Sequence, residues 1–499
     1  MEYAGMKVLV MGLGLHGGGL ESARYLARHG AEVTVTDLRD EKTLAPSIDK
    51  LEAGNSPEQP GKKERRHFRY VLGRHETADF ERADMVIKNP GVRPDSPYLK
   101  AARRIETDIS LFLRASPARL TAVTGSKGKS STATALYRVL EEAHGKAALH
   151  GALHGKAWLG GNIAVSPLSF LDELGPEDDV VLELSSWQLG DLGAGDKGRL
   201  LKPRCAVLTA IMRDHQDRYG SMEAYVEDKR VIYRGQDKGD ATVAGSDGWG
   251  LGFLAESRGR PLRYGEGALP EGTSGGWIDG GGLGFARFYE GPAASGALEG
   301  RIVEVVPERL LVPGRHQRMN LLAASLALLD LGLSPELVRE ALGSFPGIEH
   351  RLEFFHQAGG VRFYNDSAAT IPEAAAAAVA AFRGEGGAGN VEPPPLVLVT
   401  GGTDKNLDFS PLVEAAGDLE GIILLAGSGS DKLKGLLAAQ GVPFRGPFDR
   451  IDDAVQATLD AARPGSVAVL SPGCASFGMF LNEFDRGEKW KEAVRRMAN

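Results

Sequence analysis

Short apolar runs alternate with longer amphipathic stretches along most of this chain of 499 residues. Apolar runs bounded by polar or glycine-rich turns predict buried parallel strands, and the stretches with apolar residues at helical spacing predict helices. This alternation is typical of α/β sheets. The predicted strands span 6–11, 32–36, 85–88, 120–123, 180–184, 205–208, 361–364, 396–400, 422–425 and 467–470.

Two breaks in the pattern predict three domains. The first boundary lies at Ala115-Ser116-Pro117 and the second at 343–347, which gives domains of 1–115, 116–345 and 346–499. The length of the chain agrees with about three domains. Helices are predicted over 20–29, 105–113, 131–143 (stopping at Gly145) and 319–331, polar loops over 45–69 and 385–395, and short hairpin-like pieces over 245–300.

Composition narrows the class of protein. The hydrophobic share of 42% and the charged share of 25% are those of an ordinary soluble globular protein. A net charge of −8 argues against a general nucleic-acid binder. The two cysteines, Cys205 and Cys474, imply no disulfide framework. Without a signal-peptide pattern or an apolar run of spanning length, we expect a cytoplasmic protein with no membrane partner.

The stretch 124–132, TGSKGKSST, follows an apolar run and opens a predicted helix. A strand, a glycine-rich turn and a helix N-terminus together form a phosphate cradle, in which Lys129 reaches terminal phosphates and Ser130 can bind Mg²⁺. The first glycine of the common phosphate-loop pattern is replaced by Val123. We therefore predict a nucleoside triphosphate site here; the alternative is a Gly/Ser-rich turn with two surface lysines.

A second glycine motif lies near the N-terminus. Gly12, Gly14 and Gly17 have the spacing GxGxxG, and Asp37 follows at the position where dinucleotide-binding folds place a ribose-binding acid. This pattern alone indicates a Rossmann-like domain, and a nicotinamide-dependent oxidoreductase is one interpretation of it. A tight turn that binds no ligand is the other.

Several polar residues follow predicted strands, where open α/β sheets bind ligands. Glu183 is suited to Mg²⁺ or to capping a turn, and His215 to a metal or to a structural hydrogen bond. Lys229 has the sequence context of a surface lysine. Arg351, in Glu349-His350-Arg351, could reach a phosphoryl group across a cleft or belong to a surface ion-pair cluster. The segment 401–405, GGTDK, offers backbone donors and a cation suited to a carboxylate.

In this order the motifs resemble those of the Mur ligase family. The resemblance runs from VMGLG at the start to SPGCASFGMF and EFDRGEKW near the end. Its most specific motifs are TGSKGKSST, LGGN at 159–162, ELSSWQL at 183–189, DHQDRY at 214–219, NDSAAT at 365–370 and GGTDK at 401–405. ELSSWQL together with the SPGCAS turn favours the branch of the family that adds D-glutamate.

The resemblance implies an α/β protein of three domains: a Rossmann-like N-terminal domain for the UDP end of the substrate, a central P-loop domain for ATP, and a Rossmann-like C-terminal domain for the incoming amino acid. It implies an ATP-dependent ligase that adds D-glutamate to UDP-N-acetylmuramoyl-L-alanine during peptidoglycan precursor synthesis, with Mg²⁺ as cofactor. We expect a monomer.

By position, the resemblance also implies roles for individual residues. The catalytic residues would be Lys129, His215, Lys229 and Arg351. Contacts to ATP would come from Gly125, Ser126, Lys127, Gly128, Lys129, Ser130, Ser131, Asn320, Arg351 and Asp366. Mg²⁺ would be held by Ser130, Glu183, His215 and Lys229, the lysine as a carbamate. Substrate contacts would come from Gly14, Leu15, His16, Asp37, Arg39, Asn162, Ser185 and, in the D-glutamate pocket, Thr370, Lys405, Ser476 and Phe477.

The sequence departs from the family pattern at a few positions. Ala368 replaces a lysine that is common in the family, so that its contact would be missing or come from Lys405 or Lys127. Gln317 stands where asparagine is usual, and NEFDRG is offset from the usual aromatic position, which leaves the role of Phe484 open. Another Mur-type or folylpolyglutamate-type ligase with a different amino acid is the alternative function.

Overall fold

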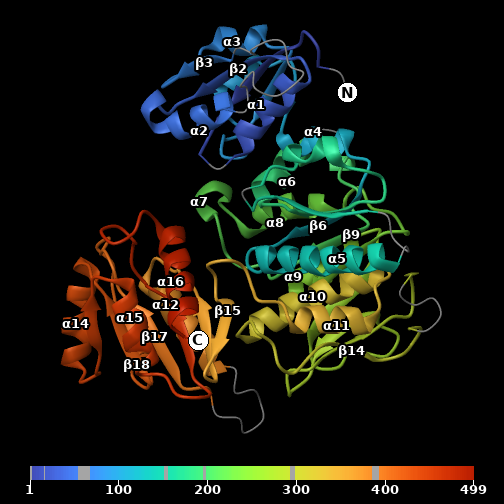
Figure 1. Cartoon of the computed structure of the whole chain (residues 1–499). Helices are drawn as coiled ribbons and strands as arrows, with labels where there is room; N and C mark the ends of the chain where they lie inside the picture. Colours follow the sequence, from blue (N-terminus) through green and yellow to red (C-terminus); the bar gives the residue numbers. More distant parts are fainter. Residues whose placement is uncertain are drawn as a thin grey trace.

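The computed structural model describes residues 3–15, 17–53, 68–150, 155–163, 165–194, 198–292, 298–384 and 393–498, with only the backbone for 147–150 and 216. Figure 1 shows an N-terminal domain, a central domain and a C-terminal domain, each built on its own sheet. No described helix combines the length and apolar character needed to cross a membrane. The predicted three-domain α/β fold is confirmed.

The N-terminal sheet has the order β3-β2-β1-β4-β5, with all neighbouring strands parallel. Its elements are β1 (Lys7–Met11), α1 (Gly18–Arg28), β2 (Glu32–Asp37), α2 (Glu41–Ala53), β3 (Arg69–Leu72), α3 (Thr77–Arg82), β4 (Met85–Lys88), η1 (Pro97–Ala101), β5 (Ile105–Glu106) and α4 (Asp108–Ala115). This order is that of a Rossmann-like sheet, as predicted.

The central sheet has the order β14-β13-β12-β11-β10-β9-β6-β8-β7 and turns antiparallel only at β12-β13-β14. Its strands are β6 (Arg119–Thr124), β7 (Ala157–Gly161), β8 (Asp179–Glu183), β9 (Cys205–Leu208), β10 (Ala241–Gly245), β11 (Arg260–Glu266), β12 (Gly275–Ile278), β13 (Gly284–Arg287) and β14 (Val303–Val306).

Helices cover both faces of the central sheet. The helices α5 (Lys129–His150), α10 (Arg315–Asp330) and α11 (Pro335–Gly343) share one apolar core. The other face packs against α6 (Ser186–Gly193), α8 (Met222–Arg230) and α9 (Gly248–Glu256), and its core continues into α1 and α4 of the N-terminal domain. The short helices α7 (Gln216–Tyr219), η2 (Pro167–Ser169), η3 (Leu171–Glu173) and η5 (Val231–Tyr233) complete this domain.

The C-terminal sheet has the order β15-β16-β20-β17-β18-β19, with only β15 antiparallel. Its elements are β15 (Glu353–Ala358), β16 (Val361–Asn365), α12 (Pro372–Arg383), β17 (Leu396–Thr400), α13 (Ser410–Ala415), β18 (Gly421–Leu425), α14 (Ser428–Ala439), β19 (Arg445–Phe448), α15 (Ile451–Leu459), β20 (Val467–Leu470) and α16 (Glu483–Met497). α12, α13 and α14 cover one face, and α15 and α16 the other.

Four local predictions need correction. The predicted loop 45–69 begins as helix α2, because Leu44 and Leu51 are buried at helical spacing; 54–67 lie outside the described residues. α5 continues through Gly145, which does not adopt a positive φ. The segment 105–113 is divided, because Thr107 caps α4 and so ends β5. The segment 245–300 contains α9, capped by Asp247, as well as its hairpin. Of the predicted loop 385–395, residues 385–392 lie outside the described residues.

Candidate functional site

The phosphate loop joins β6 to α5 through two glycines in backbone conformations that disfavour side chains. Gly125 has a φ of 152° and Gly128 a φ of 91°. A Cβ on Gly125 would overlap Thr209 Oγ1, and one on Gly128 would overlap Asn320 Oδ1. Only glycine therefore permits Thr209 and Asn320 to approach the loop so closely. The predicted contact residue Asn320 thus lies directly against the loop, from the second turn of α10.

Two lysine ammonium groups meet inside this loop. Lys129 Nζ donates to Gly125 O at 3.0 Å and to Ser126 O at 3.1 Å, and Lys229 Nζ donates to the same Gly125 O at 2.9 Å. Lys229 is 1% exposed and lies over the Tyr225 ring. Burial, reinforced by the charge of Lys129, lowers the pKa of Lys229 to about 7. The interpretation of Lys229 as a surface lysine is therefore wrong.

The backbone amides of the loop fall into two groups. Ser126 N and Lys127 N both donate to Ala210 O, at 2.8 Å and 3.3 Å, so they are bonded to the segment after β9. The first amide to close a helical turn is that of Thr132, which donates to Gly128 O. The amides of Lys129, Ser130 and Ser131 precede it at the positive end of the α5 dipole, where an anion is favoured.

Glu183 is the last residue of β8, and among the described residues only one of its two carboxylate oxygens has a hydrogen-bond partner. Its side chain is 1% exposed, and Oε1 accepts a hydrogen bond from Asn162 Nδ2 at 2.9 Å. Its Oε2 is buried and has no hydrogen-bond partner among the described residues. A buried carboxylate oxygen in this state is costly unless a cation completes it. The predicted metal ligand Glu183 therefore fits Mg²⁺, which prefers oxygen ligands.

His215 precedes α7 in a strained backbone conformation, with a φ of 50°. Its side chain is 44% exposed, its Nε2 lies 3.8 Å from Asp214 Oδ2, and its ring centroid lies 5.2 Å from that of Trp187. An exposed imidazole beside a carboxylate can bind a metal or hold a ligand.

Two predicted site serines lie at the starts of helices. Ser130 is half-buried in the first turn of α5. Ser185 caps α6 by accepting a hydrogen bond from Gln188 N.

The N-terminal glycine motif is held by Asp37. The carboxylate of Asp37 accepts hydrogen bonds from Gly14 N at 3.2 Å and from Arg39 N at 2.9 Å. Ser47, from the unpredicted helix α2, donates to Gly14 O at 2.8 Å. Leu15 is 46% exposed beside these residues, and His16 lies outside the described residues. The two oxygens of Asp37 thus order the loop and the start of the next segment.

Two buried contacts join the N-terminal and central domains next to this motif. Lys88 Nζ lies 2.6 Å from Asp191 Oδ2, and both side chains are buried. Asp108 Oδ2 accepts a hydrogen bond from Ser166 Oγ at 3.2 Å, and burial raises the pKa of Asp108 to about 6. These residues were not predicted from the sequence; the polar residue at the end of the apolar run 85–88 was the available signal for Lys88.

In the C-terminal domain, Asp366 is fixed by two donors. Its Oδ2 accepts a hydrogen bond from Ser471 Oγ at 2.6 Å and its Oδ1 one from Leu352 N at 3.2 Å. Burial raises the pKa of Asp366 to about 7, while the hydrogen bonds from Ser471 and Leu352 and, to a smaller extent, the charge of Arg351 oppose the shift. The structure thus brings together Arg351 and Asp366, two of the predicted ATP contacts.

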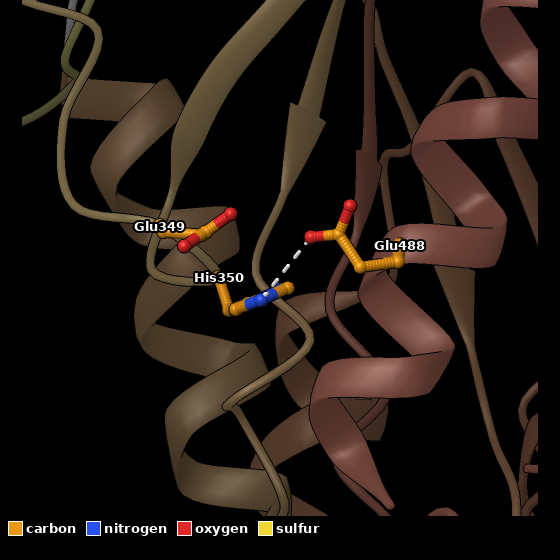
Figure 2. Close-up of side chains that lie close together, drawn as sticks. All are labelled: Glu349, His350 and Glu488. Atoms are coloured by element: carbon orange, nitrogen blue, oxygen red, sulfur yellow. Dashed lines mark ion pairs between the residues drawn. The ribbon is translucent and has the colours of Figure 1, made fainter. Parts of the chain in front are cut away.

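The segment before Arg351 is braced by α16. Figure 2 shows His350 between Glu349 and Glu488, with Glu488 Oε1 3.5 Å from His350 Nε2. Atoms of these three groups lie within 4.8 Å of one another, which would suit a metal. However, Lys491 Nζ lies 3.0 Å from Glu349 Oε1 and 2.7 Å from Glu488 Oε1. An ammonium group therefore already lies between these carboxylates, so the cluster acts as an ion-pair brace for the segment before Arg351 and not as a metal site.

The predicted D-glutamate pocket lies on turns that follow strands of the C-terminal sheet. Thr403 and Ala475 pair through their backbones, and Thr403 Oγ1 donates to Phe477 O. Lys405 Nζ lies 5.9 Å from the centroid of the Phe477 ring. Ser476 is buried and Thr370 is half-buried. The GGTDK and SPGCAS turns are therefore neighbours, and they combine a cation with small polar side chains.

Three family models match the chain, one in each part. The N-terminal domain model "Mur ligase MurD-like" matches 6–110, "Mur ligase middle domain" matches 123–269, and the model "Mur ligase, glutamate ligase domain" matches 350–474. All predicted C-terminal contacts except Ser476 and Phe477 lie within the third match, and the phosphate loop lies within the second.

Curated proteins resemble the chain along its whole length. A protein of Treponema pallidum named UDP-N-acetylmuramoylalanine--D-glutamate ligase is 40% identical, with 98% of both chains covered. A Roseiflexus protein of the same name is 39% identical, with 99% of both chains covered. Among solved structures, UDP-N-acetylmuramate-alanine ligase from Thermotoga maritima gives a TM-score of 0.53 at 19% identity, covering 98% of this chain and 99% of that one. This structural likeness concerns the fold.

Proposed function

This chain belongs to the Mur ligase family, and we propose that it uses ATP to join D-glutamate to UDP-N-acetylmuramoyl-L-alanine in peptidoglycan precursor synthesis. The observation that carries the proposal is the end-to-end similarity, at up to 40% identity, to proteins named for this reaction. The phosphate loop, the half-satisfied Glu183 and the paired GGTDK and SPGCAS turns support it. The reaction takes place in the cytoplasm, on small molecules, in a monomeric enzyme.

The first step activates a carboxylate. The alanyl carboxylate of the substrate attacks the γ-phosphorus of ATP, and ADP leaves, which produces an acyl phosphate. Such a transfer needs positioning and charge neutralisation more than covalent help. Lys129 and the first amides of α5 hold the phosphates, Asn320 and Asp366 hold the nucleoside side, and Arg351 reaches the transferring group.

Residues around the phosphate loop would hold Mg²⁺: Ser130, Glu183, His215 and Lys229, the last as a carbamate. When bound, the metal neutralises phosphate charge and aligns attacking and leaving oxygens. The buried Oε2 of Glu183 supplies an oxygen ligand that lacks another partner among the described residues. Lys229 is suited to carbamate formation because a neutral amine captures CO₂ with loss of a proton, and burial favours its neutral form.

The second step forms the amide. The free amine of D-glutamate attacks the acyl carbonyl, and the tetrahedral intermediate collapses to the amide and inorganic phosphate. We assign the D-glutamate pocket to Thr370, Lys405, Ser476 and Phe477. Gly14, Leu15, His16, Asp37 and Arg39 bind the UDP end, and Asn162 and Ser185 contact the substrate nearer the reacting carboxylate. Because an acyl phosphate hydrolyses readily, the cleft must exclude water during the reaction.

Phosphate release with UDP-N-acetylmuramoyl-L-alanine tests the proposal. Release should require ATP, Mg²⁺ and D-glutamate together. A preference for L-alanine, L-lysine, meso-diaminopimelate or L-glutamate would assign the protein to another branch of the family. NADH fluorescence provides a separate check on the oxidoreductase alternative, and saturable NADH binding with no phosphate release would overturn the ligase assignment.

A further inference from the structure

Arg486 is one of the largest fully buried side chains of the protein, at 0% exposure. It lies in the first turns of α16. Its guanidinium donates from Nε to Ser367 Oγ at 2.9 Å, from Nη2 to Ser367 O at 2.9 Å and from Nη1 to Cys474 O at 3.1 Å. The function proposed above gives this residue no role.

These three hydrogen bonds join two turns that are far apart in the sequence. Ser367 lies in the turn after β16, three residues before Thr370, and Cys474 lies in the turn after β20, two residues before Ser476. Ser367 Oγ also donates to Glu483 O at 2.6 Å, which fixes the turn to the start of α16. A planar fork of donors constrains the direction of the bonds as well as their length. Arg486 therefore sets the separation of the turns that carry Thr370 and Ser476.

Gly487, which follows Arg486, allows α16 to pack closely enough for these hydrogen bonds to form. A Cβ on Gly487 would overlap His350 Nδ1 and would lie 2.9 Å from Asn365 Oδ1. With glycine there, α16 lies directly against His350 and the end of β16. The Arg486 side chain thus reaches Ser367 and Cys474 from the first turn of α16.

Among the described residues no carboxylate forms an ion pair with the guanidinium, and the charge of Glu483 acts on it without such a contact. The three hydrogen bonds of the guanidinium within the described chain all go to uncharged oxygens. Burial lowers the pKa of Arg486 only to about 10, so the group stays protonated at neutral pH. A buried positive charge acts strongly on nearby anions, because protein screens it less than water does. It therefore favours an anionic ligand in the adjoining pocket.

We propose that Arg486 is a positioning residue of the amino-acid pocket, which fixes the spacing of the 367–370 and 474–476 turns and places one positive charge behind them. The identity of the amino acid rests on the proposed function. The nucleotide side should be independent of Arg486, because Asp366 is held by Ser471 and by the amide of Leu352.

Steady-state kinetics of Arg486→Met and Arg486→Lys test this. Met keeps the apolar stem but removes the fork and the charge, whereas Lys keeps the charge and loses the fork. Arg496→Met is the matched control, because Arg496 lies on the same helix with its side chain 59% exposed, paired with Asp452. Trapping the acyl phosphate with hydroxylamine measures the first step separately, and thermal melting monitors folding.

For Arg486→Met we expect the KM for D-glutamate to rise about 10- to 100-fold, as for small displacements of reacting groups. Arg486→Lys should recover part of this loss. The KM values for ATP and for the UDP substrate, and the yield of trapped hydroxamate, should stay close to those of the unaltered protein and of Arg496→Met.

Equal losses in all three KM values, or an unchanged KM for D-glutamate in both variants, would overturn the inference. Equal KM values for D-glutamate in the Met and Lys variants would show that the positive charge of Arg486 does not contribute and would overturn that part of the proposal. If the unaltered protein releases no phosphate with D-glutamate, the proposed function fails instead, and the amino acid that does support release is then used for the same comparison.

Discussion

Lys129 and Lys229 donate hydrogen bonds to one acceptor, the carbonyl oxygen of Gly125, at 3.0 Å and 2.9 Å. One lysine comes from the start of α5 and the other from α8, so the loop closes around both ammonium groups. Two like charges in a buried site disfavour each other, and the more buried Lys229 has its pKa lowered to about 7. Burial lowers the pKa of Lys129 as well, and we expect Lys229 to be the lysine whose neutral amine is available for reaction.

Lys229 should carry CO₂ in the active protein. The fraction of neutral amine rises as the pH increases through about 7, so carbamate formation should increase in the same direction. With ¹³C-labelled bicarbonate, we expect one carbamate signal that disappears in Lys229→Ala and persists in Lys238→Ala, a change at an exposed lysine. Full activity in CO₂-free buffer with no such signal would contradict the prediction.

Lys129→Ala should lower kcat by at least about 10²-fold, because an electrostatic contact to the transferring phosphoryl group is lost. The protein should stay folded, because the Lys129 side chain bonds only to carbonyls of its own loop among the described residues. The control is Lys146→Ala, near the other end of α5, where the side chain is 47% exposed. Phosphate release and circular dichroism provide the two measurements, and near-normal turnover of Lys129→Ala would exclude the proposed role.

Glu183→Gln should separate catalysis from stability. The amide can still accept the hydrogen bond from Asn162, but it removes the anionic ligand, so kcat should fall by about 10²-fold and half-maximal activity should need more Mg²⁺. In EDTA the variant should melt at the same temperature as the unaltered protein or higher, since a buried, half-satisfied charge has been removed. Glu173→Gln, at an exposed carboxylate, serves as control. A large loss of melting temperature in EDTA would instead assign Glu183 a structural role.

Asp108 should make the stability of the chain depend on pH in an unusual direction. Its pKa is raised from 3.8 to about 6 in the folded state, so the folded protein keeps this proton where the unfolded chain has lost it. The contribution of Asp108 to the free energy of unfolding is fully present below pH 3.8. It is lost as the pH rises to about 6, and the total loss is at most about 3 kcal/mol. The difference in melting temperature between Asp108→Asn and the unaltered protein should therefore grow in favour of the variant across this window. A difference that is constant with pH would contradict the prediction.

Most of the fold could be predicted because parallel strands buried on both faces are nearly continuous apolar runs, as at β17 (Leu396–Thr400) and β20 (Val467–Leu470). Helix α2 could not, because Pro46 and its polar residues suggest a loop until Leu44 and Leu51 are seen to be buried. The phosphate loop could be predicted because its chemistry is local, with the strand, the turn and the helix contiguous in the sequence.

The sequence does not show which charged side chains of the site are buried, because their burial depends on distant segments. Lys229 and Arg486 look like surface residues in their own helices, and only packing against Gly125 and Ser367 shows that they are buried. Asp108 likewise acquires its environment from Ser166 of another domain. A single sequence gives no direct signal of which charged residues the tertiary contacts will enclose.

The bond from Arg486 to Ser367 spans 119 positions of the chain. Protein chains are synthesised from the N-terminus, and domains fold largely in that order. The central sheet can therefore form while most of the last domain is still to be made, whereas the turns after β16 and β20 lack their common tether until residue 486 has left the ribosome. In a nascent protein the phosphate loop can thus form well before the turns of the last domain are tied together, whereas the predicted nucleotide contact Asp366 acquires its partner Ser471 only when that last domain has been made.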